Sequence, residues 1–386
     1  MKKSSLLGSA TTVSGATAVS RILGLIREQV MAYFFGAGMA TDAFVTAYRI
    51  PNLLRDLFAE GALSSAFVPI FKERLGTDSK ENAFKLAHVV ITAILVIVGL
   101  LVLLGIVASP ALIYLFANGF TSDAAKFDLT VNLTQVMMAY LLLVSLSAVI
   151  MGMLNSFGRF GIPAISPAMF NIGTIVAVFA LYETFDTPIY TMAIGVLVGG
   201  VGQVAIQLPS LWRIGYRFRF SVNIFDAGLR RVGRLITPMI IGLSAGRINI
   251  LASTMIASFL VEGTISYLNY SYRLMHFPLG VFAVAIGTVA LPRAAELVAR
   301  KENHKVGETF LNAVGLNLYV VLPSAAFLGL LGPLIVDLVY RWGAFSALDS
   351  QRTALTLLHY AYGLIGFAVV RVVVPFFYAF DDSKTP

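Results

Sequence analysis

The sequence predicts an all-α protein that crosses a membrane many times. Hydrophobic residues make up 58% of its 386 residues and charged residues 12%, whereas a soluble domain has about 45–50% apolar and about 25% charged residues. The mean hydropathy is +0.83. The apolar runs reach the ~20 residues that a spanning helix needs, and they do not alternate as membrane strands do. A soluble domain could not bury this much apolar surface.

Ten segments are predicted to span the membrane, as two pseudo-symmetric lobes of six and four helices. The first six are 13–36, 41–71, 86–117, 129–154, 162–182 and 188–211, and the last four are 235–260, 264–291, 309–340 and 353–380. The residues before the first span, Ser4–Ser20, are rich in Ser, Thr and Ala and lack the apolar centre of a signal peptide.

Basic residues mark the loop after every second span and predict the orientation of the chain. With the N-terminus in the cytoplasm, 18 Lys and Arg lie in loops on the inner side. Three lie in outer loops, namely Lys126, Arg341 and Arg352. This bias agrees with the positive-inside rule and accounts for the net charge of +8 without nucleic acid.

The longest basic loop divides the chain into 1–211, an N-terminal lobe, 212–234, a basic cytoplasmic linker or interfacial segment, and 235–386, a C-terminal lobe. The linker alternates Arg with aromatic residues, which predicts an interfacial helix or a linker lying on anionic lipid. RNA binding is the weaker alternative.

A weak internal repeat supports two related lobes. Tyr48-Arg49-Ile50 aligns with Tyr272-Arg273-Leu274 at an offset of 224, and Phe58-Ala59 then aligns with Phe282-Ala283. Pro and Gly interrupt the two spans that carry the repeat, 41–71 and 264–291. Such interruptions are typical of transporters, although close helix packing also explains these residues. By the same offset the second lobe would need about two more helices, so we expect it to be truncated.

Seven Arg residues fall inside the predicted spans, namely Arg21, Arg27, Arg49, Arg55, Arg247, Arg273 and Arg371. Each costs about 2.5–3.5 kcal/mol at a helix centre unless a partner compensates. In the first two spans four acids, Glu28, Asp42, Asp56 and Glu60, balance four Arg. Arg21 and Glu28 are seven residues apart and share a helix face.

The later spans carry three Arg and a single acid, Asp337, near the end of the span 309–340. An unneutralised guanidinium group needs water and an anion, and its planar fork matches phosphate bidentately. The sequence therefore predicts a hydrated cavity for an anionic, phosphate-bearing substrate. An exporter of cationic drugs would instead favour unpaired acids.

Cysteine and histidine usage removes other classes. Cys is absent, which excludes disulfides and thiolate metal sites, and the four His lack metal-site spacing. We therefore expect no cofactor. A membrane transferase would need catalytic carboxylates or His near loops, whereas His88 and His359 lie alone on predicted helices.

The run SRILGLIREQVMAYFFGAGMATDAFVTAYRIPNLLRDLFAEGALSSAFVPIFKE, from Ser20 to Glu73, closely resembles the MurJ/MviN lipid II flippases of the multidrug/oligosaccharidyl-lipid/polysaccharide exporter superfamily. Further matches are NSFGRFGIPAISPAMFNI, YRLMHFPLGVFAVAIGTVALP and FYAFDDSKTP. The resemblance covers essentially the whole chain and implies the flippase fold of that superfamily.

The resemblance implies a multi-pass protein of the bacterial inner membrane that takes part in peptidoglycan and cell-wall biogenesis. It implies alternating access that moves lipid II from the cytoplasmic to the periplasmic leaflet, and a monomer in contact with membrane lipids. Coupling to the membrane potential or to a monovalent cation is left open. The alternatives are an exporter of another lipid-linked oligosaccharide, a multidrug exporter or, less favoured, a transferase enzyme.

The resemblance also implies roles for the charged residues. Arg21, Arg27, Arg55 and Arg273, with Asn52, are expected to bind the diphosphate of the substrate. Gating or charge balance is expected of Asp42, Glu28, Arg49, Asp56, Glu60 and His276. Relatives often carry an acid at the position of His276, so we expect this imidazole to make transport sensitive to pH.

Overall fold

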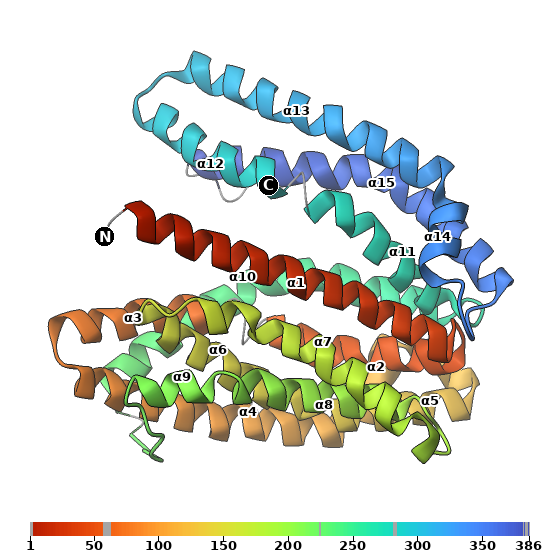
Figure 1. Cartoon of the computed structure of the whole chain (residues 1–386), viewed down its shortest axis with the longest axis horizontal. Coiled ribbons are helices and arrows are strands. Elements are labelled where there is room, and N and C mark those ends of the chain that lie inside the picture. The colour runs from red at the N-terminus through yellow and green to blue at the C-terminus, as the bar shows by residue number, and fades with distance from the viewer. Residues whose placement is uncertain are drawn as a thin grey trace. The chain divides into compact units, whose positions relative to one another are not determined.

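The computed structural model describes the backbone of residues 3–56, 63–223, 225–280, 284–380, 382 and 385. It describes the side chains of 13–56, 63–223, 225–239, 249–280, 286–287, 289–380, 382 and 385. In these residues every regular element is a helix (Figure 1). The chain forms two compact units. Unit 1 contains residues 1–31 and 38–265, and unit 2 contains residues 32–37 and 266–386.

Unit 1 is built from ten α-helices and two short 3₁₀ helices in its described residues. They are α1 (Lys3–Phe35, whose end belongs to unit 2), α2 (Met39–Arg55), α3 (Ser64–Thr77), α4 (Lys80–Phe116), η2 (Asn118–Ser122), α5 (Ala124–Met138), α6 (Tyr140–Ser156), α7 (Gly161–Leu181), η3 (Tyr182–Thr184), α8 (Tyr190–Ala205), α9 (Leu208–Arg213) and α10 (Ala227–Ser258). Helix α7 packs closely on α8, because glycines let the two backbones approach. A Cβ atom at Gly199 would lie 2.6 Å from the Phe170 carbonyl oxygen.

Unit 2 is a smaller bundle around α15. Its helices are α11 (Thr264–Pro278), α12 (Val284–Ala299), α13 (Asn303–Leu330), α14 (Gly332–Tyr340) and α15 (Ala347–Ala379), and α15 packs on α12, α13 and α14. The chain turns after α1 at Gly36, whose φ is +62°. A Cβ atom there would lie 2.7 Å from the Ala344 carbonyl oxygen, so only glycine fits.

Six helical segments of the described chain are long and apolar enough to cross a membrane. They are Lys80–Phe116, Ala124–Ser156, Gly161–Thr184, Tyr190–Arg213, Asn303–Leu330 and Ala347–Ala379. The all-α, multi-pass prediction is confirmed, and these six correspond to six of the ten predicted spans. The other four correspond to α1, α2 with α3, α10, and α11 with α12, which are more polar or broken. The total of ten spans and the division into six and four stay predictions.

The predicted spans 41–71 and 264–291 are each broken in the structure. In the first span, α2 is followed by a wider, π-helical turn at Asp56. In the second span, α11 is followed by such a turn at Leu279 and Gly280. The offset of 224 places Asp56 on Gly280, so the two helices are interrupted at corresponding positions. The matching Phe-Ala pairs of the repeat lie outside the described residues.

Helix ends differ from the predicted boundaries where a side chain caps the first turn. Helix α10 begins at Ala227 rather than at 235, because the Asp226 carboxylate accepts hydrogen bonds from the Gly228 and Leu229 N–H groups at 2.8 and 3.0 Å. The segment 212–234 therefore contains the end of α9, the non-helical residues 214–223 and 225–226, and two turns of α10. The lobe boundaries at 211 and 235 stay predictions.

Candidate substrate-binding site

Arg27 lies where α1 crosses α7 in unit 1. Its guanidinium group donates to the Glu28 carboxylate at 2.6 Å and lies 5.1 Å from the centre of the Phe170 ring. Phe170 in turn stacks with Tyr48 of α2, with ring centres 5.9 Å apart. Because Glu28 is 2% exposed, its buried charge needs Arg27 as a partner. This ion pair fixes the guanidinium group on an aromatic platform.

Arg21 lies nearly two turns before Arg27 on α1 and has an exposed side chain. It makes no ion pair with any residue whose side chain is described. Beside it, the Asn171 side chain of α7 donates to the Ser20 carbonyl oxygen at 3.1 Å. Helix α1 is thereby held against α7 while Arg21 remains available to a ligand.

Arg55 is the last residue of α2 and precedes the π-helical turn at Asp56. Its guanidinium group pairs with the neighbouring Asp56 carboxylate at 2.9 Å, and both side chains are half-buried. Asn52 precedes Arg55 by three residues and therefore lies on the same face of α2. Asn52, Arg55 and Asp56 thus all lie at one helix end.

Arg49 contacts a hydroxyl group of another helix. Its guanidinium group donates a short hydrogen bond to Thr254 Oγ1 of α10. Thr254 is nearly fully buried, so Arg49 links α2 to α10. The role of Arg49 in gating or charge balance stays a prediction.

Asp42 is the centre of a buried polar cluster near the start of α2. It is 1% exposed, and its Oδ2 atom accepts from Lys126 Nζ of α5 and from the Gly263 N–H group, both at 2.8 Å. Glu262, one residue before Gly263, accepts from the Met39 N–H group at 2.7 Å. The start of α2 and the turn before α11 therefore cap each other.

The assignment of Lys126 to an exposed outer loop was wrong. The residue lies in the first turn of α5 and its side chain is 10% exposed. A lysine next to a loop is normally solvated, but the Asp42 carboxylate compensates for burying this one. The one available signal was that the buried Asp42 needed a cation on the same side of the membrane.

Unit 2 contributes Arg273 and His276 of α11. Arg273 is exposed, and the His276 ring lies against the Tyr272 ring with centres 3.8 Å apart. The charges of Arg273 and of Arg371 on α15 both act electrostatically on His276. Two of the three Arg residues predicted for the second half, Arg273 and Arg371, therefore lie near His276 in unit 2, whereas Arg247 belongs to α10 of unit 1. Glu60 and the Arg247 side chain lie outside the described residues.

These helices present guanidinium groups that each keep unused N–H donors. An Arg has five such donors, and a carboxylate occupies at most two or three of them. Arg21, Arg27, Arg55 and Arg273 can therefore each bind phosphate oxygens. Ion pairs with Glu28 and Asp56 hold Arg27 and Arg55 in place. The described cavity of unit 2 has a volume of about 370 Å³ and is lined by residues of α13 to α15, among them Asp337 and Ser350. It contains none of the predicted site residues.

A family model described as "Lipid II flippase MurJ" matches residues 31–386. The chain belongs to the MurJ lipid II flippase family. The family resemblance deduced from the sequence is therefore confirmed, and a protein of this family is a transporter rather than an enzyme.

The relatives of this family match over nearly the whole chain. "Lipid II flippase MurJ" of Burkholderia cenocepacia is 34% identical over 379 residues, which cover 97% of this chain and 73% of the relative. "Probable lipid II flippase MurJ" of Vibrio cholerae is 35% identical over 393 residues, covering 99% and 74%.

The solved structures agree with this family and with its superfamily. "Lipid II flippase MurJ, inward closed conformation" superposes with a TM-score of 0.80 at 29% identity, covering 97% of this chain and 77% of that chain. A multidrug resistance transporter of the MATE family, in an inward-facing conformation, has a TM-score of 0.58 at 15% identity. The latter likeness shows the fold alone.

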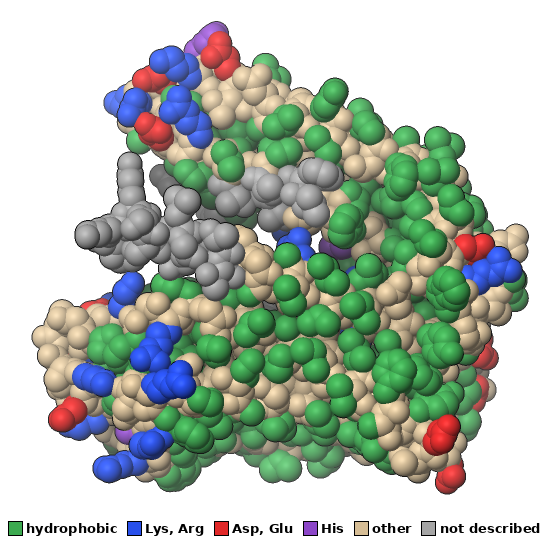
Figure 2. Space-filling model, in the orientation of Figure 1, with side chains coloured by type: hydrophobic (Ala, Val, Ile, Leu, Met, Phe, Trp, Pro, Cys, Tyr) green, Lys and Arg blue, Asp and Glu red, His purple; other side chains and the backbone are tan. Residues whose placement is uncertain are grey.

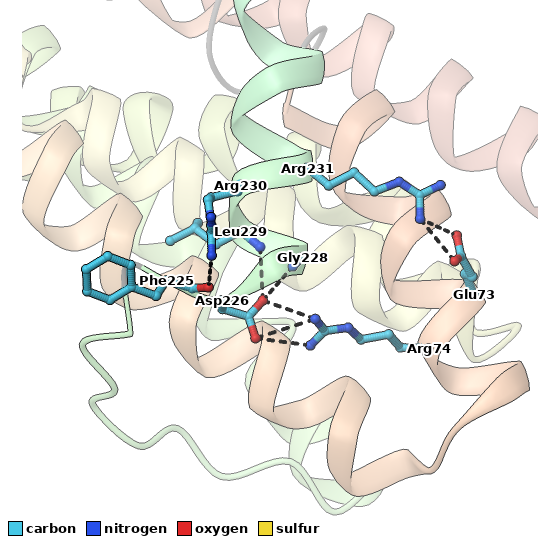
Figure 3. A network of polar contacts seen from close by, with 8 residues as sticks. All are labelled: Glu73, Arg74, Phe225, Asp226, Gly228, Leu229, Arg230 and Arg231. Atoms are coloured by element: carbon cyan, nitrogen blue, oxygen red, sulfur yellow. Dashed lines mark hydrogen bonds and ion pairs between the residues drawn. The ribbon is translucent and has the colours of Figure 1, made fainter.

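The way α10 is anchored was not foreseen from the sequence. Figure 3 shows that Arg74 of α3 pairs with Asp226 at 3.1 Å and that Arg231 of α10 pairs with Glu73 at 2.8 Å. Burial alone would raise the pKa of Asp226. Hydrogen bonds from the Leu229 N–H group and from Arg74, and the charge of Arg74, instead hold that pKa below its ordinary value. These two ion pairs thus fix the start of α10, the helix that carries Thr254, to α3.

Proposed function

We propose that this protein is a lipid II flippase of the bacterial inner membrane and moves its substrate from the cytoplasmic to the periplasmic leaflet. The observation that carries this proposal is the match to the lipid II flippase family from residue 31 to residue 386. The reaction makes and breaks no covalent bond. It requires a polar site for the headgroup and an apolar surround for the lipid tail.

In the proposed mechanism the lobes rock about a cavity that opens alternately to each side of the membrane. Arg21, Arg27, Arg55 and Arg273 attract the diphosphate of the substrate, and Asn52 orients it. Asp42, Glu28, Arg49, Asp56, Glu60 and His276 balance charge or hold the gates. The capping of α2 by Glu262 and the ion pair of Asp42 with Lys126 support a gating role for the start of α2.

The ten spans, the lobes of six and four helices and the cytoplasmic N-terminus belong to the same proposal. Helices broken at corresponding places in α2–α3 and α11–α12 support two related lobes. No cofactor is proposed, and one copy of the chain is proposed to suffice. A positively charged cavity couples to the membrane potential with about 2.3 kcal/mol per charge per 100 mV, which favours the potential as a driving force.

The test is complementation of flippase-depleted cells with measurement of accumulated lipid II. We expect Arg27→Ala, Arg55→Ala and Arg273→Ala each to abolish flipping while the protein still inserts into the membrane. Arg→Lys variants should restore only part of the activity, because the ammonium group lacks the bidentate fork. Arg300→Ala is the matched control, since this exposed Arg pairs with Glu296 at the α12–α13 turn.

Normal growth of cells that depend on all three Ala variants would contradict the proposed site. If the unaltered protein inserts but does not relieve lipid II accumulation, the substrate is another lipid-linked oligosaccharide. That result would overturn the substrate assignment and leave the family membership standing.

A further inference from the structure

Residues 214–223, called the ribbon below, follow α9 without regular secondary structure and are fixed to α4. Tyr216 is buried, and its hydroxyl group lies 3.0 Å from His88 Nδ1. The Arg219 N–H group donates to the same ring nitrogen at 3.2 Å, and the Ser221 N–H group donates to Thr92 Oγ1 at 3.0 Å. These three contacts, from residues 216, 219 and 221, hold it along one turn of α4.

The position of these contacts on α4 places the ribbon at the membrane interface. The lipid-exposed apolar stripe of α4 begins at Val96 and continues through Ile97, Leu100, Leu103, Leu104 and Val107. Thr92 and His88 precede Val96 by four and eight residues, which is about 6 and 12 Å along a helix. The headgroup layer is about 5–8 Å deep on each side of the hydrocarbon core, so Thr92 lies within it and His88 just outside it. The ribbon therefore runs along the outer part of the headgroup layer on the basic side of unit 1.

The exposed side chains of the ribbon are aromatic, aliphatic and basic. Phe218, Phe220 and Val222 alternate along it, with Phe220 64% and Val222 71% exposed. The Arg217 guanidinium group lies 5.2 Å from the centre of the half-exposed Trp212 ring. Three apolar side chains are therefore exposed close together in the sequence, next to the basic ones.

The basic residues at the end of α9 and in the ribbon lack acidic partners among the described residues. Arg213, Arg217 and Arg219 are exposed and make no ion pair with any described residue, whereas Arg74 and Arg231 nearby are paired with acids (Figure 3). In Figure 2, Lys and Arg side chains gather over the left end of unit 1 and acidic ones at its right end. The ribbon thus offers phosphate-binding forks beside side chains that favour the acyl boundary.

We propose that residues 212–222 form a binding site for anionic phospholipids of the cytoplasmic leaflet. Arg213, Arg217 and Arg219 bind the phosphates of the lipids, while Phe218, Phe220 and Val222 insert at the level of the glycerol groups. Charge complementarity and the depth set by His88 and Thr92 select a lipid surface over a soluble polyanion. The site is separate from the proposed transport site.

The test uses the two tryptophans of the chain, Trp212 and Trp342. In a Trp342→Phe variant, Trp212 reports on the ribbon alone. The full chain is reconstituted in phosphatidylcholine vesicles that contain brominated phosphatidylglycerol or, at the same mole fraction, brominated phosphatidylcholine. We expect at least about twofold stronger quenching by the anionic lipid, because several cationic side chains enrich it locally. Added salt should reduce the difference.

Matched variants separate the site from general effects. In the same background, Arg213→Gln/Arg217→Gln/Arg219→Gln should remove the excess quenching, whereas Arg293→Gln/Arg300→Gln, which alters Arg residues paired with Glu296, should retain it. A Trp212→Phe variant, in which Trp342 reports, should show equal quenching by both lipids. Equal quenching of Trp212 by the two lipids would overturn the proposal, and so would a response of Trp212 to added RNA without a preference for lipid charge.

Discussion

At the scale of single residues, Asp42 shows how a charge is tolerated deep inside a membrane protein. Its carboxylate combines an ion pair with Lys126 and a hydrogen bond from the Gly263 N–H group. Each partner comes from a different part of the chain. A buried pair of this kind adds little net stability compared with apolar residues, but removing one partner leaves a buried charge uncompensated.

Asp42→Asn should therefore destabilise the protein by about 3–5 kcal/mol. The double variant Asp42→Asn/Lys126→Met should recover much of that loss, because no buried charge is then left unpaired. The measurement is the unfolding free energy in detergent micelles. Arg231→Gln is the control, since it removes an exposed pair with Glu73 and should change stability by less than about 1 kcal/mol. A double variant no more stable than Asp42→Asn would argue against this account.

At the scale of elements, the start of α10 combines a helix cap with an ion pair. The Asp226 carboxylate accepts from two N–H groups of the first turn and from Arg74 of α3. The negative charge also lies at the positive end of the helix dipole. One side chain therefore both starts α10 and fixes it to its neighbour.

The lowered pKa of Asp226 predicts a dependence of stability on pH. Its contribution is fully present above the pKa of the unfolded chain, about 4, and is lost as the pH falls through the lower pKa of the folded protein. Asp226→Asn keeps the cap but loses the charge, so it should cost about 1 kcal/mol near neutral pH and progressively less below about pH 4. Unfolding measured across this range tests it.

Asp186→Asn, a change at an exposed residue, is the control for the unfolding measurements across pH. This loop residue makes no ion pair among the residues that the structure describes, and its replacement should leave the pH profile of stability unchanged. A difference between the unaltered protein and Asp226→Asn that stays constant down to about pH 3 would show that Asp226 has no lowered pKa.

The helices were predictable from the sequence, but their interruptions were only partly so. Apolar length identified the spans, because a bilayer sets a minimum length for a helix. Pro and Gly indicated the breaks after Arg55 and after Pro278. The separation of α13 from α14 at Leu331 was missed because both sides of the break are apolar, although Gly332 and Pro333 begin α14. The 3₁₀ segments η2 and η3 lie at the ends of spans, where apolar length carries no information.

The candidate site was predictable in its residue types and less so in its pairings. A count of charges found the Arg residues, and the structure shows Arg27 and Arg55 each beside an adjacent acid. The spacing of seven residues suggested a more distant pairing along each helix. The contacts of Asp42 with Lys126 and of Arg49 with Thr254 join residues 84 and 205 positions apart, and no local pattern encodes such distances.

At the scale of the whole molecule, the charges divide each unit into a basic and a less basic end. In unit 1 the basic end contains α9, the ribbon and the start of α10, and in unit 2 it is the turn between α12 and α13. The positive-inside rule assigns these ends to the cytoplasm. The distribution seen in Figure 2 for unit 1 agrees with that assignment.

The absence of cysteine from the sequence makes this orientation easy to test. We expect Asp186→Cys and Leu348→Cys to react with a membrane-impermeant maleimide added to intact spheroplasts, because both replace exposed residues at the less basic ends. Asn223→Cys and His304→Cys should react only after the membrane is permeabilised. The reverse pattern would place the N-terminus outside the cell.

The cluster at Asp42 also sets an order of assembly during synthesis. Lys126 emerges from the ribosome 84 residues after Asp42, and Gly263 follows 221 residues after it. At about 5–20 residues per second, the last of these partners arrives about 11 to 44 s after Asp42. The ion pair with Lys126 can form long before the turn at Gly263 exists. The nascent first unit therefore neutralises its deepest charge early, but it completes the cap on α2 only when more than two-thirds of the chain has been made.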